Sequence, residues 1–212
     1  MFDFNSIENF DDHIDNSIPS YEVMAQLVRN LSPWFLSSSK SIVDLGCSTG
    51  KLLESIYHDG MKYGVDIATN LLPESKLNCE YLNVPIQFLE WDKFVQPSLV
   101  LSIFTLQFLP VEDRITVLQN VYDSLAIGGA FIWAEKIVNE YGDDQELFDF
   151  AHYDFKREHF TAEEILDKER DLRKLLRPNT TVKNLEFAHQ AGFGNGVLLW
   201  KFLNFECWLF RK

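Results

Sequence analysis

The chain has 212 residues and a formal net charge of −13, and hydrophobic residues make up 46% of it. This length suits one domain with a substantial core, and the 14% share of aromatic residues argues against disorder. An acidic surface repels phosphate backbones, so direct contact with nucleic acid is not expected.

The cysteines and the apolar stretches limit where the protein can act. Cys47, Cys79 and Cys207 are too few and too widely spaced for a disulfide framework or a zinc site, so no metal is expected. They favour a reducing, cytoplasmic location. The first residues lack the features of a signal peptide, and no run approaches the roughly eighteen apolar residues that span a bilayer, so no membrane partner is expected.

The first two thirds of the chain alternate between strand and helix patterns. Residues 1–40 are expected to form an N-terminal helical lid or flank, with a helix from Tyr21 to about Leu31 that Ser20 caps. Strands are predicted over 41–45, 62–66, 86–90, 99–104 and 130–137, and helices over 51–58, 71–77 and 111–125. This alternation predicts an α/β, doubly wound and mostly parallel sheet with right-handed crossovers.

The last third departs from this rhythm. Residues 142–177 are long, charged and helical in pattern, which predicts a helical insertion after the fifth strand, packed over the open end of the sheet. A helix is predicted over 181–191, and two strand-like runs within 197–210 predict a C-terminal antiparallel hairpin. Residues 41–212 are therefore expected to form one domain that carries this insertion.

A glycine turn follows the first predicted strand. It contains Gly46, Ser48 and Gly50, and glycine lets backbone N–H groups approach a ligand closely. The helix N-terminus that comes next favours a negatively charged group such as a carboxylate. Asp44, just before the turn, can orient its amides and reach a ligand's ammonium group. The alternative is an ordinary tight turn.

Two further acids follow predicted strands. Asp66 ends the second strand, where a carboxylate can accept hydrogen bonds from both hydroxyls of a ribose. Asp92 follows the third, where the adenine amino group would lie. Alone, each acid could equally be a helix cap or a solvated turn residue. Together with Gly46 and Phe104 they predict that strand ends converge around one adenosyl group.

S-adenosylmethionine (SAM) is expected as the ligand rather than NAD. A dinucleotide fingerprint places glycine two residues after its first glycine, and this chain has Ser48 at that position. A single turn flanked by glycines suits the amino-acid end of SAM better than a pyrophosphate. The pattern therefore predicts a class I SAM-dependent methyltransferase with a Rossmann-like fold.

Several longer motifs carry a more specific resemblance. They are DLGCS at 44–48, FTLQFL at 104–109, GGA at 128–130, EK at 135–136 and HYDFKR at 152–157. These motifs resemble the carboxy-S-adenosylmethionine synthase family, whose members have the class I methyltransferase fold. The resemblance implies a SAM-dependent transferase that converts SAM and prephenate into carboxy-SAM. A partner enzyme then uses this product to modify the tRNA wobble uridine, and family members form homodimers.

The resemblance also implies which residues contact the cofactor. They are Tyr21, Gly46, Cys47, Ser48, Asp66, Ile67, Asp92 and Lys93. The strand-end argument adds Asp44, Gly50 and Phe104 to this set.

Two positions bear on the reaction. Ile103 stands where the family has an asparagine, and isoleucine cannot donate that hydrogen bond. A gapless count from the HYDFKR motif places Arg170 where a family arginine reaches the added carboxylate, with Glu169 before it. Three hypotheses stay open: methyl transfer to a small, anionic acceptor, carboxy-SAM synthesis, and a catalytically idle SAM-fold binding protein.

The candidate catalytic residues lie in the predicted insertion. His152 and Tyr153 are expected to contact or deprotonate an acceptor, and Arg157 and Arg170 to pair with a substrate carboxylate. The alternatives are that His152 packs against the sheet edge and that both arginines form surface ion pairs with neighbouring acids. Gln107 is expected to orient substrate or close the pocket floor.

Overall fold

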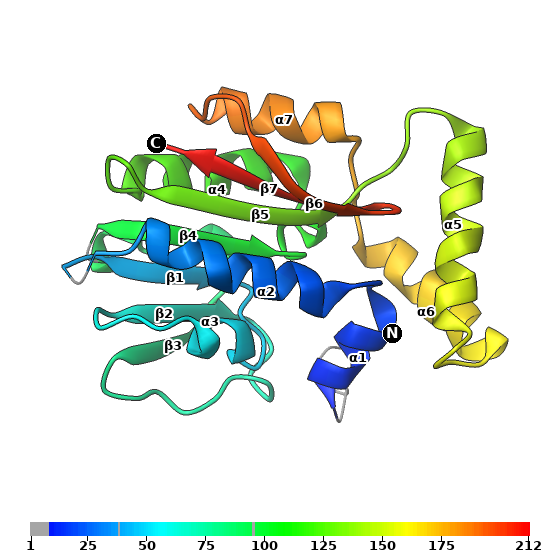
Figure 1. Cartoon of the computed structure of the whole chain (residues 1–212), viewed down its shortest axis with the longest axis horizontal. Coiled ribbons are helices and arrows are strands. Elements are labelled where there is room, and N and C mark those ends of the chain that lie inside the picture. The colour runs from blue at the N-terminus through cyan, green and yellow to red at the C-terminus, as the bar shows by residue number, and fades with distance from the viewer. Residues whose placement is uncertain (1–8, 38, 95) are drawn as a thin grey trace.

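A computed structural model of the chain describes residues 9–37, 39–94 and 96–212. One seven-stranded sheet runs through the molecule (Figure 1). Its strands are β1 (Ser41–Leu45), β2 (Lys62–Asp66), β3 (Cys79–Asn83), β4 (Pro97–Ile103), β5 (Ala130–Lys136), β6 (Val197–Phe202) and β7 (Phe205–Arg211).

The strand order is β3-β2-β1-β4-β5-β7-β6. The strands from β1 to β5 pair in parallel, whereas β7 is antiparallel to both β5 and β6. The predicted α/β, mostly parallel sheet with a C-terminal antiparallel hairpin is therefore confirmed. Because β1 pairs with both β2 and β4, the order of the parallel strands reverses there, and open sheets bind ligands beyond such a reversal.

Helices cover both faces of the sheet and its carboxyl edge (Figure 1). They are α1 (Phe10–Ser17), α2 (Tyr21–Leu31), α3 (Lys51–Ser55), α4 (Val111–Ser124), α5 (Gly142–Lys156), α6 (Ala162–Leu175) and α7 (Thr181–Gln190). Short 3₁₀ turns are η2 (Ser32–Trp34), η3 (Ile86–Phe88), η4 (Trp91–Lys93) and η5 (Leu106–Phe108). The predicted insertion forms α5 and α6, which lie past the carboxyl ends of the parallel strands together with α1.

The core has two layers because alternate residues of each strand point to opposite faces of the sheet. Val43 and Leu45 of β1 belong to the cluster that α4 and α7 cover. Ile42, which precedes Val43 and points to the opposite face, belongs to the cluster that α2 and α3 cover, with Met24 and Val28 from α2. All five residues of β1 are buried, as expected for a central strand with helices on both faces.

Two predicted elements are wrong. The third strand is β3 at Cys79–Asn83, and the residues predicted as that strand contain η3 instead. The reason is that β3 lies at the sheet edge and is only partly buried, so its sequence is less apolar than the run at 86–90. The predicted helix over 71–77 is not helical, and Lys76 forms an isolated bridge with Cys79.

The N-terminal flank contains one helix that the sequence predicts and one that it does not. Helix α2 has the predicted bounds, but Ser20 adopts a left-handed conformation (φ 57°) and its side chain does not cap the helix. Helix α1 was not predicted. It is polar and short, and the Asn9 side chain caps it by accepting a hydrogen bond from the Asp12 N–H. The predicted domain boundary at residue 40 stays a prediction.

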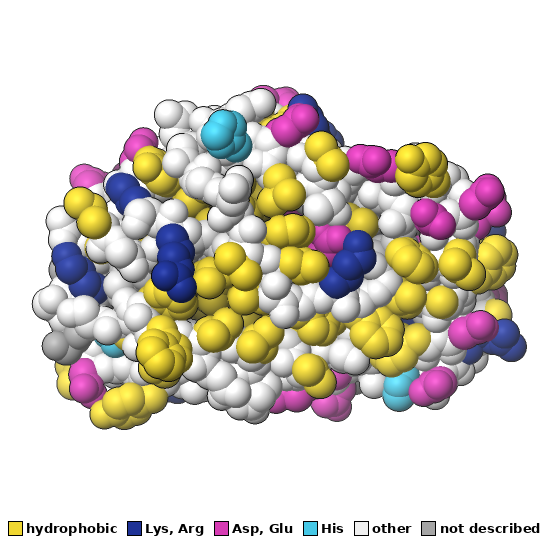
Figure 2. Space-filling view, turned by 45° about the horizontal axis from the view of Figure 1, so that its top comes forward, with side chains coloured by type: hydrophobic (Ala, Val, Ile, Leu, Met, Phe, Trp, Pro, Cys, Tyr) yellow, Lys and Arg dark blue, Asp and Glu magenta, His cyan; other side chains and the backbone are white. Residues whose placement is uncertain are grey.

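Hydrophobic side chains are visible on part of the surface. On the face in Figure 2 they form a band, and the Lys and Arg side chains there are few and separated. The exposed hydrophobic residues include Val197, Leu198 and Phe202 on β6. Across the described ranges, none of the helices has both the length and the apolar character needed to cross a membrane.

The packing of α2 on the sheet can be tested with two substitutions on one helix. Met24 is fully buried, so Met24→Ala should lower the free energy of unfolding by about 2–5 kcal/mol because it leaves a cavity. Val23, which is 63% exposed, is the matched control, and Val23→Ala should change stability by less than about 0.5 kcal/mol. Urea unfolding followed by tryptophan fluorescence measures both. Equal effects of the two substitutions would contradict this packing.

Candidate functional site

A cavity of about 690 Å³ opens at the carboxyl edge of the sheet. Its walls come from α1 and α2, from the ends of β1, β2, β4 and β5, and from α5 and α6. The cavity thus lies at the strand reversal between β1 and β4. Helices α5 and α6, which we call the cap, cover it (Figure 1). Its lining also includes Pro85, Ile86 and Gln87, which follow β3.

The glycine turn forms one wall of this cavity. Gly46 has a φ of +80°, and a Cβ atom there would overlap the Thr105 side chain. The N–H groups of Gly46 and Cys47 both donate to the carbonyl oxygen of Val65, which fixes the turn against β2. The Ser48 hydroxyl is buried and has no hydrogen-bond partner among the described residues. At the cavity, the turn therefore presents backbone that a ligand can approach closely and one polar atom without a hydrogen-bond partner among the described residues.

Asp66 connects the turn to β2. Its carboxylate accepts hydrogen bonds from the Ser48 N–H and the Ala68 N–H, each at 2.8 Å. These bonds hold the carboxylate at the cavity wall, at the position where the sequence predicts the ribose. Each oxygen keeps further acceptor capacity because a carboxylate oxygen has two lone pairs.

Asp44 is a buried carboxylate with an unusual electrostatic environment. It is 3% exposed, and none of the described groups donates a hydrogen bond to it. Burial, with a smaller contribution from the negative charge of Asp66, raises the pKa of Asp44 to about 7. Burial and the charge of Asp44 also raise the pKa of the nearby Tyr21 hydroxyl. A buried carboxylate without a partner is stabilised by a cation, so this wall suits an ammonium group.

Phe104 directly follows β4 and lines the cavity. Its φ of 58° is uncommon for a residue that is not glycine, and its N–H donates to the Ala134 carbonyl at 2.8 Å. Its ring lies 6.3 Å from the Tyr21 ring and 5.7 Å from the Phe205 ring. These three rings form an aromatic boundary between the turn and the cap.

Gln107 supports this aromatic boundary through two hydrogen bonds to the backbone. Its side-chain amide donates to the Phe104 carbonyl at 3.0 Å, and its side-chain oxygen accepts from the Lys136 N–H at 2.8 Å. Both ends of the amide group are therefore engaged by backbone. Gln107 supports the ends of β4 and β5, and it also lines the cavity.

The cap end of the cavity is rich in lysine. Lys136 from β5, Lys156 from α5 and Lys168 from α6 all line it, together with Glu169. Lys156 forms a buried ion pair with Glu169 at 2.8 Å. Lys168 donates to the Ser17 hydroxyl at 2.9 Å and also contacts His13. We refer to Lys136, Lys156, Lys168 and Glu169 as the lysine compartment.

His152 lines the cavity but is poorly suited to act as a base. Its Nε2 donates to the Ser17 carbonyl at 2.8 Å. Burial, with the nearby charge of Lys156, lowers the pKa of His152 to about 3, so the imidazole is neutral at neutral pH. A base with so low a pKa accepts a proton only weakly. The hydrogen bond instead attaches α5 to the end of α1.

The structure gathers most of the predicted site residues. Those that line the cavity are Tyr21, Asp44, Gly46, Cys47, Ser48, Asp66, Ile67, Phe104 and His152. Those that do not are Gly50, Asp92, Lys93, Tyr153, Arg157 and Arg170. Among the described residues, no group of His, Cys, Asp and Glu side chains could hold a metal ion.

Each residue outside the lining has another position or partner. Gly50 precedes α3 with a φ of +70° and lies against Tyr81. Asp92 and Lys93 lie in η4, and because β3 ends earlier than predicted, residues 85–87 occupy the place expected for Asp92.

The two predicted arginines are exposed at the surface. Arg157 pairs with Asp154 at 3.7 Å and Arg170 pairs with Asp167 at 3.0 Å, each within one helical turn. This is the alternative that the sequence left open for them. The neighbour of Arg170, Glu169, lines the cavity instead.

Sequence reasoning missed the lysine compartment. Its members come from three elements, and Lys156 and Lys168 read as ordinary charged positions of helices. The motifs at 135–136 and 152–157 contain Lys136 and Lys156, and they are the sequence feature that could have pointed to this compartment. Only the packing of α5 and α6 over the sheet brings them together.

Comparison with known proteins identifies the family. No family model matches the chain. It is 32% identical to the carboxy-S-adenosyl-L-methionine synthase of Staphylococcus epidermidis, over 92% of this chain and 89% of that protein. This chain belongs to the carboxy-S-adenosyl-L-methionine synthase family. The synthase of Vibrio parahaemolyticus serotype O3:K6 is also 32% identical, over 96% of this chain and 88% of its own length.

Solved structures confirm the fold. Human N-acetylserotonin methyltransferase in complex with SAM superposes with a TM-score of 0.58 at 14% identity, over 91% of this chain and 52% of that chain. PigF with SAH gives 0.55 at 14% identity, over 90% and 56%. The chain thus spans about half the length of these neighbours, and at this identity they show the class I methyltransferase fold alone. With the family, they confirm a SAM-dependent transferase.

The role of Asp44 predicts a pH dependence for SAM binding. Its pKa of about 7 means that the carboxylate becomes protonated as the pH falls below 7, and the neutral form attracts an ammonium group less. SAM affinity should therefore fall between pH 7 and 5.5. Asp44→Asn should weaken binding about tenfold to a hundredfold and flatten this profile. Isothermal titration calorimetry measures both effects.

Asp92→Asn is the matched control, because Asp92 is exposed and does not line the cavity. It should leave the affinity for SAM and its pH profile unchanged. If Asp44→Asn bound SAM as tightly as the native chain at every pH, Asp44 would not be the ammonium partner.

Proposed function

We propose that this chain is a carboxy-SAM synthase: it binds SAM at the strand reversal and replaces one hydrogen of the SAM methyl group by the carbon dioxide that prephenate releases, with phenylpyruvate and water as the other products. The observation that carries this proposal is the continuity of one cavity from the glycine turn to the lysine compartment. One end presents the unpartnered carboxylate of Asp44, and the other presents three lysine side chains beside one carboxylate. Such a cavity suits a cationic nucleoside at one end and an anion at the other.

The residues around the turn fit SAM. Asp44 is placed to hold the amino group, and the unsatisfied Ser48 hydroxyl can bond a polar atom of the ligand. Asp66 stands where ribose hydroxyls can donate to it, while Ile67 and Ile86 offer apolar surface to a base. When bound, SAM supplies a methyl group that the positive sulfur activates.

The cap end fits an anionic second substrate. Prephenate carries two carboxylates, and ammonium groups in a site screened from water bind such groups strongly. The chain's own contribution is to hold the two substrates together and to keep water out. The low pKa of His152 argues against a base at that position, so we assign it the task of attaching α5 to the end of α1.

A second candidate is methyl transfer to a small, anionic acceptor. Two observations favour it. Ile103 lines the cavity where the family has an asparagine, and Arg170, the counted equivalent of the family arginine, is exposed and paired with Asp167. Under this hypothesis the lysine compartment holds the acceptor rather than prephenate.

One incubation distinguishes these candidates. With SAM and prephenate, the chain should form carboxy-SAM, which mass spectrometry detects as SAM heavier by one carbon dioxide. Without prephenate, this product should be absent. Formation of S-adenosylhomocysteine with a small carboxylate acceptor, and no carboxy-SAM with prephenate, would favour methyl transfer. SAM binding without either product would make the chain a binding protein.

We also propose that the chain forms a homodimer, as the resemblance implies. Strand β6 is an outer strand of the sheet and carries exposed Val197, Leu198 and Phe202. An uncovered strand with apolar side chains is a typical pairing surface. Sedimentation equilibrium should give about twice the 24.7 kDa of one chain, and Leu198→Lys should shift it toward one. A single-chain mass for the native protein would contradict the dimer.

A further inference from the structure

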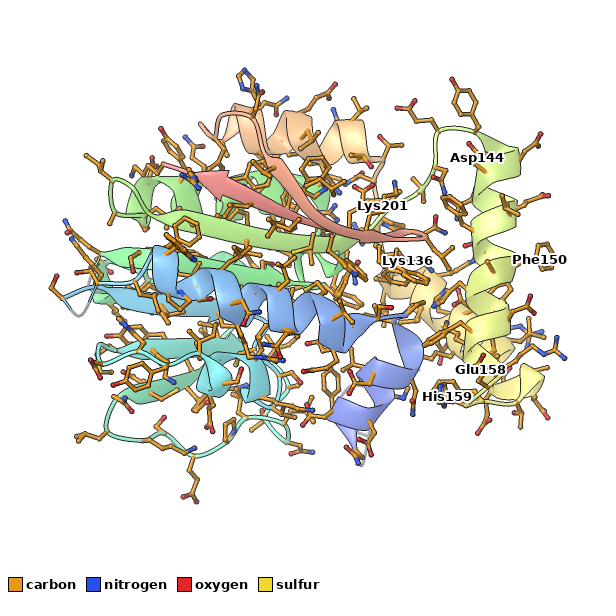
Figure 3. All side chains as sticks on the ribbon, viewed as in Figure 1. Lys136, Asp144, Phe150, Glu158, His159 and Lys201 are labelled. Atoms are coloured by element: carbon orange, nitrogen blue, oxygen red, sulfur yellow. The ribbon has the colours of Figure 1, made fainter. Side chains whose placement is uncertain are left out.

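Lys136 differs from the other lysines of the cavity. It ends β5, and Figure 3 shows it between the carboxyl end of that strand and α5. Its ammonium group lies 5.9 Å from the centre of the Phe205 ring. Within the described part of the chain, it forms no ion pair and its side chain has no hydrogen-bond partner.

The other two lysines already have partners. Lys156 forms the buried ion pair with Glu169, in which the side chains are 4% and 13% exposed. Lys168 contacts Ser17 and His13 on α1. Lys136 is therefore the lysine of the compartment whose ammonium group has no hydrogen-bond or ion-pair partner among the described residues. A partly buried ammonium group without a counter-ion is stabilised by an anion.

The surroundings of Lys136 agree with this. Burial lowers its pKa, and the charges of Lys156 and Arg173 lower it further, whereas Glu169 and Asp149 act in the opposite direction. The nearby imidazole of His152 is neutral. A carboxylate beside Lys136 would relieve the repulsion among these cations, and an aromatic ring nearby leaves an apolar surface for the rest of the molecule.

We propose that Lys136 binds a carboxylate of the second substrate, and that Glu169, by pairing with Lys156, limits how strongly the compartment attracts anions. This deepens the proposed function and rests on it only for the identity of the substrate. Lys136 then determines whether an anion binds beside SAM, and Glu169 determines how tightly. The two side chains carry opposite charges, so neutralising Lys136 should weaken anion binding and neutralising Glu169 should strengthen it.

Calorimetric titration of the full chain, saturated with SAM, tests the role of Lys136. Prephenate is one probe and malonate, a dicarboxylate without a ring, is the other. Lys136→Met should weaken the binding of prephenate about tenfold or more, while SAM affinity in the absence of an anion changes by less than about twofold. Lys136→Arg should restore much of the anion binding.

Lys174→Met is the matched control. It also removes one positive charge, in this case from α6. Lys174 is exposed, pairs with Asp171 and does not line the cavity. It should leave the binding of SAM and of both anions unchanged. Thermal unfolding of every variant shows that it is folded, and Lys136→Gln replaces Lys136→Met if that variant is not.

Glu169→Gln tests the second half of the proposal. The substitution frees Lys156 from its ion pair, so prephenate and malonate should both bind several times more tightly. Unchanged or weaker anion binding in this variant would overturn the role of Glu169. Native anion affinity in folded Lys136→Met, or no anion binding to the native chain at millimolar concentration, would overturn the role of Lys136.

The anion titrations and the product assay test different claims, so one can fail while the other succeeds. Carboxylate binding that depends on Lys136, with no carboxy-SAM formed, would support the anion site and contradict the synthase reaction. Carboxy-SAM formation by Lys136→Met at native prephenate KM would support the reaction and contradict the anion site.

Discussion

The reversal of strand order between β1 and β4 is the constraint on which the site depends. From β1 the chain leads to β2 and β3 on one side, and β4 and β5 continue on the other, so the loops that leave these strands diverge. The space between them cannot be filled by the sheet itself. The glycine turn forms one wall, the end of β4 forms the other, and the helices after β5 close the top.

Charge divides this space into two ends. Asp44 and Asp66 lie at the turn, and their mutual repulsion contributes to the raised pKa of Asp44. The lysine compartment lies at the cap, in a chain whose net charge is −13. The rings of Tyr21, Phe104 and Phe205 stand between the two ends. Opposite charges are thus kept apart inside one cavity, which a cationic and an anionic substrate can occupy together.

The sequence predicted the parts of this arrangement that depend on local pattern. The apolar runs and glycines located β1, β2, β4 and β5, and the turn from Asp44 to Gly50 pointed to the edge of the sheet where the cavity opens. The sequence did not locate β3, because a half-exposed edge strand lacks the apolar run that marks a buried one. Since the third strand was predicted too late in the chain, Asp92 was expected at a strand end that it does not follow. The sequence could not identify Lys136 or Glu169 as neighbours, since tertiary packing alone joins β5 to α6.

Helix α1 is tied at both ends of the cavity. Thr49 of the glycine turn donates to Asp11 at 2.9 Å, and the Ser17 carbonyl accepts from His152 of the cap. Displacing this helix from the cavity wall therefore breaks both hydrogen bonds at once, so the glycine turn and the cap are mechanically coupled through α1.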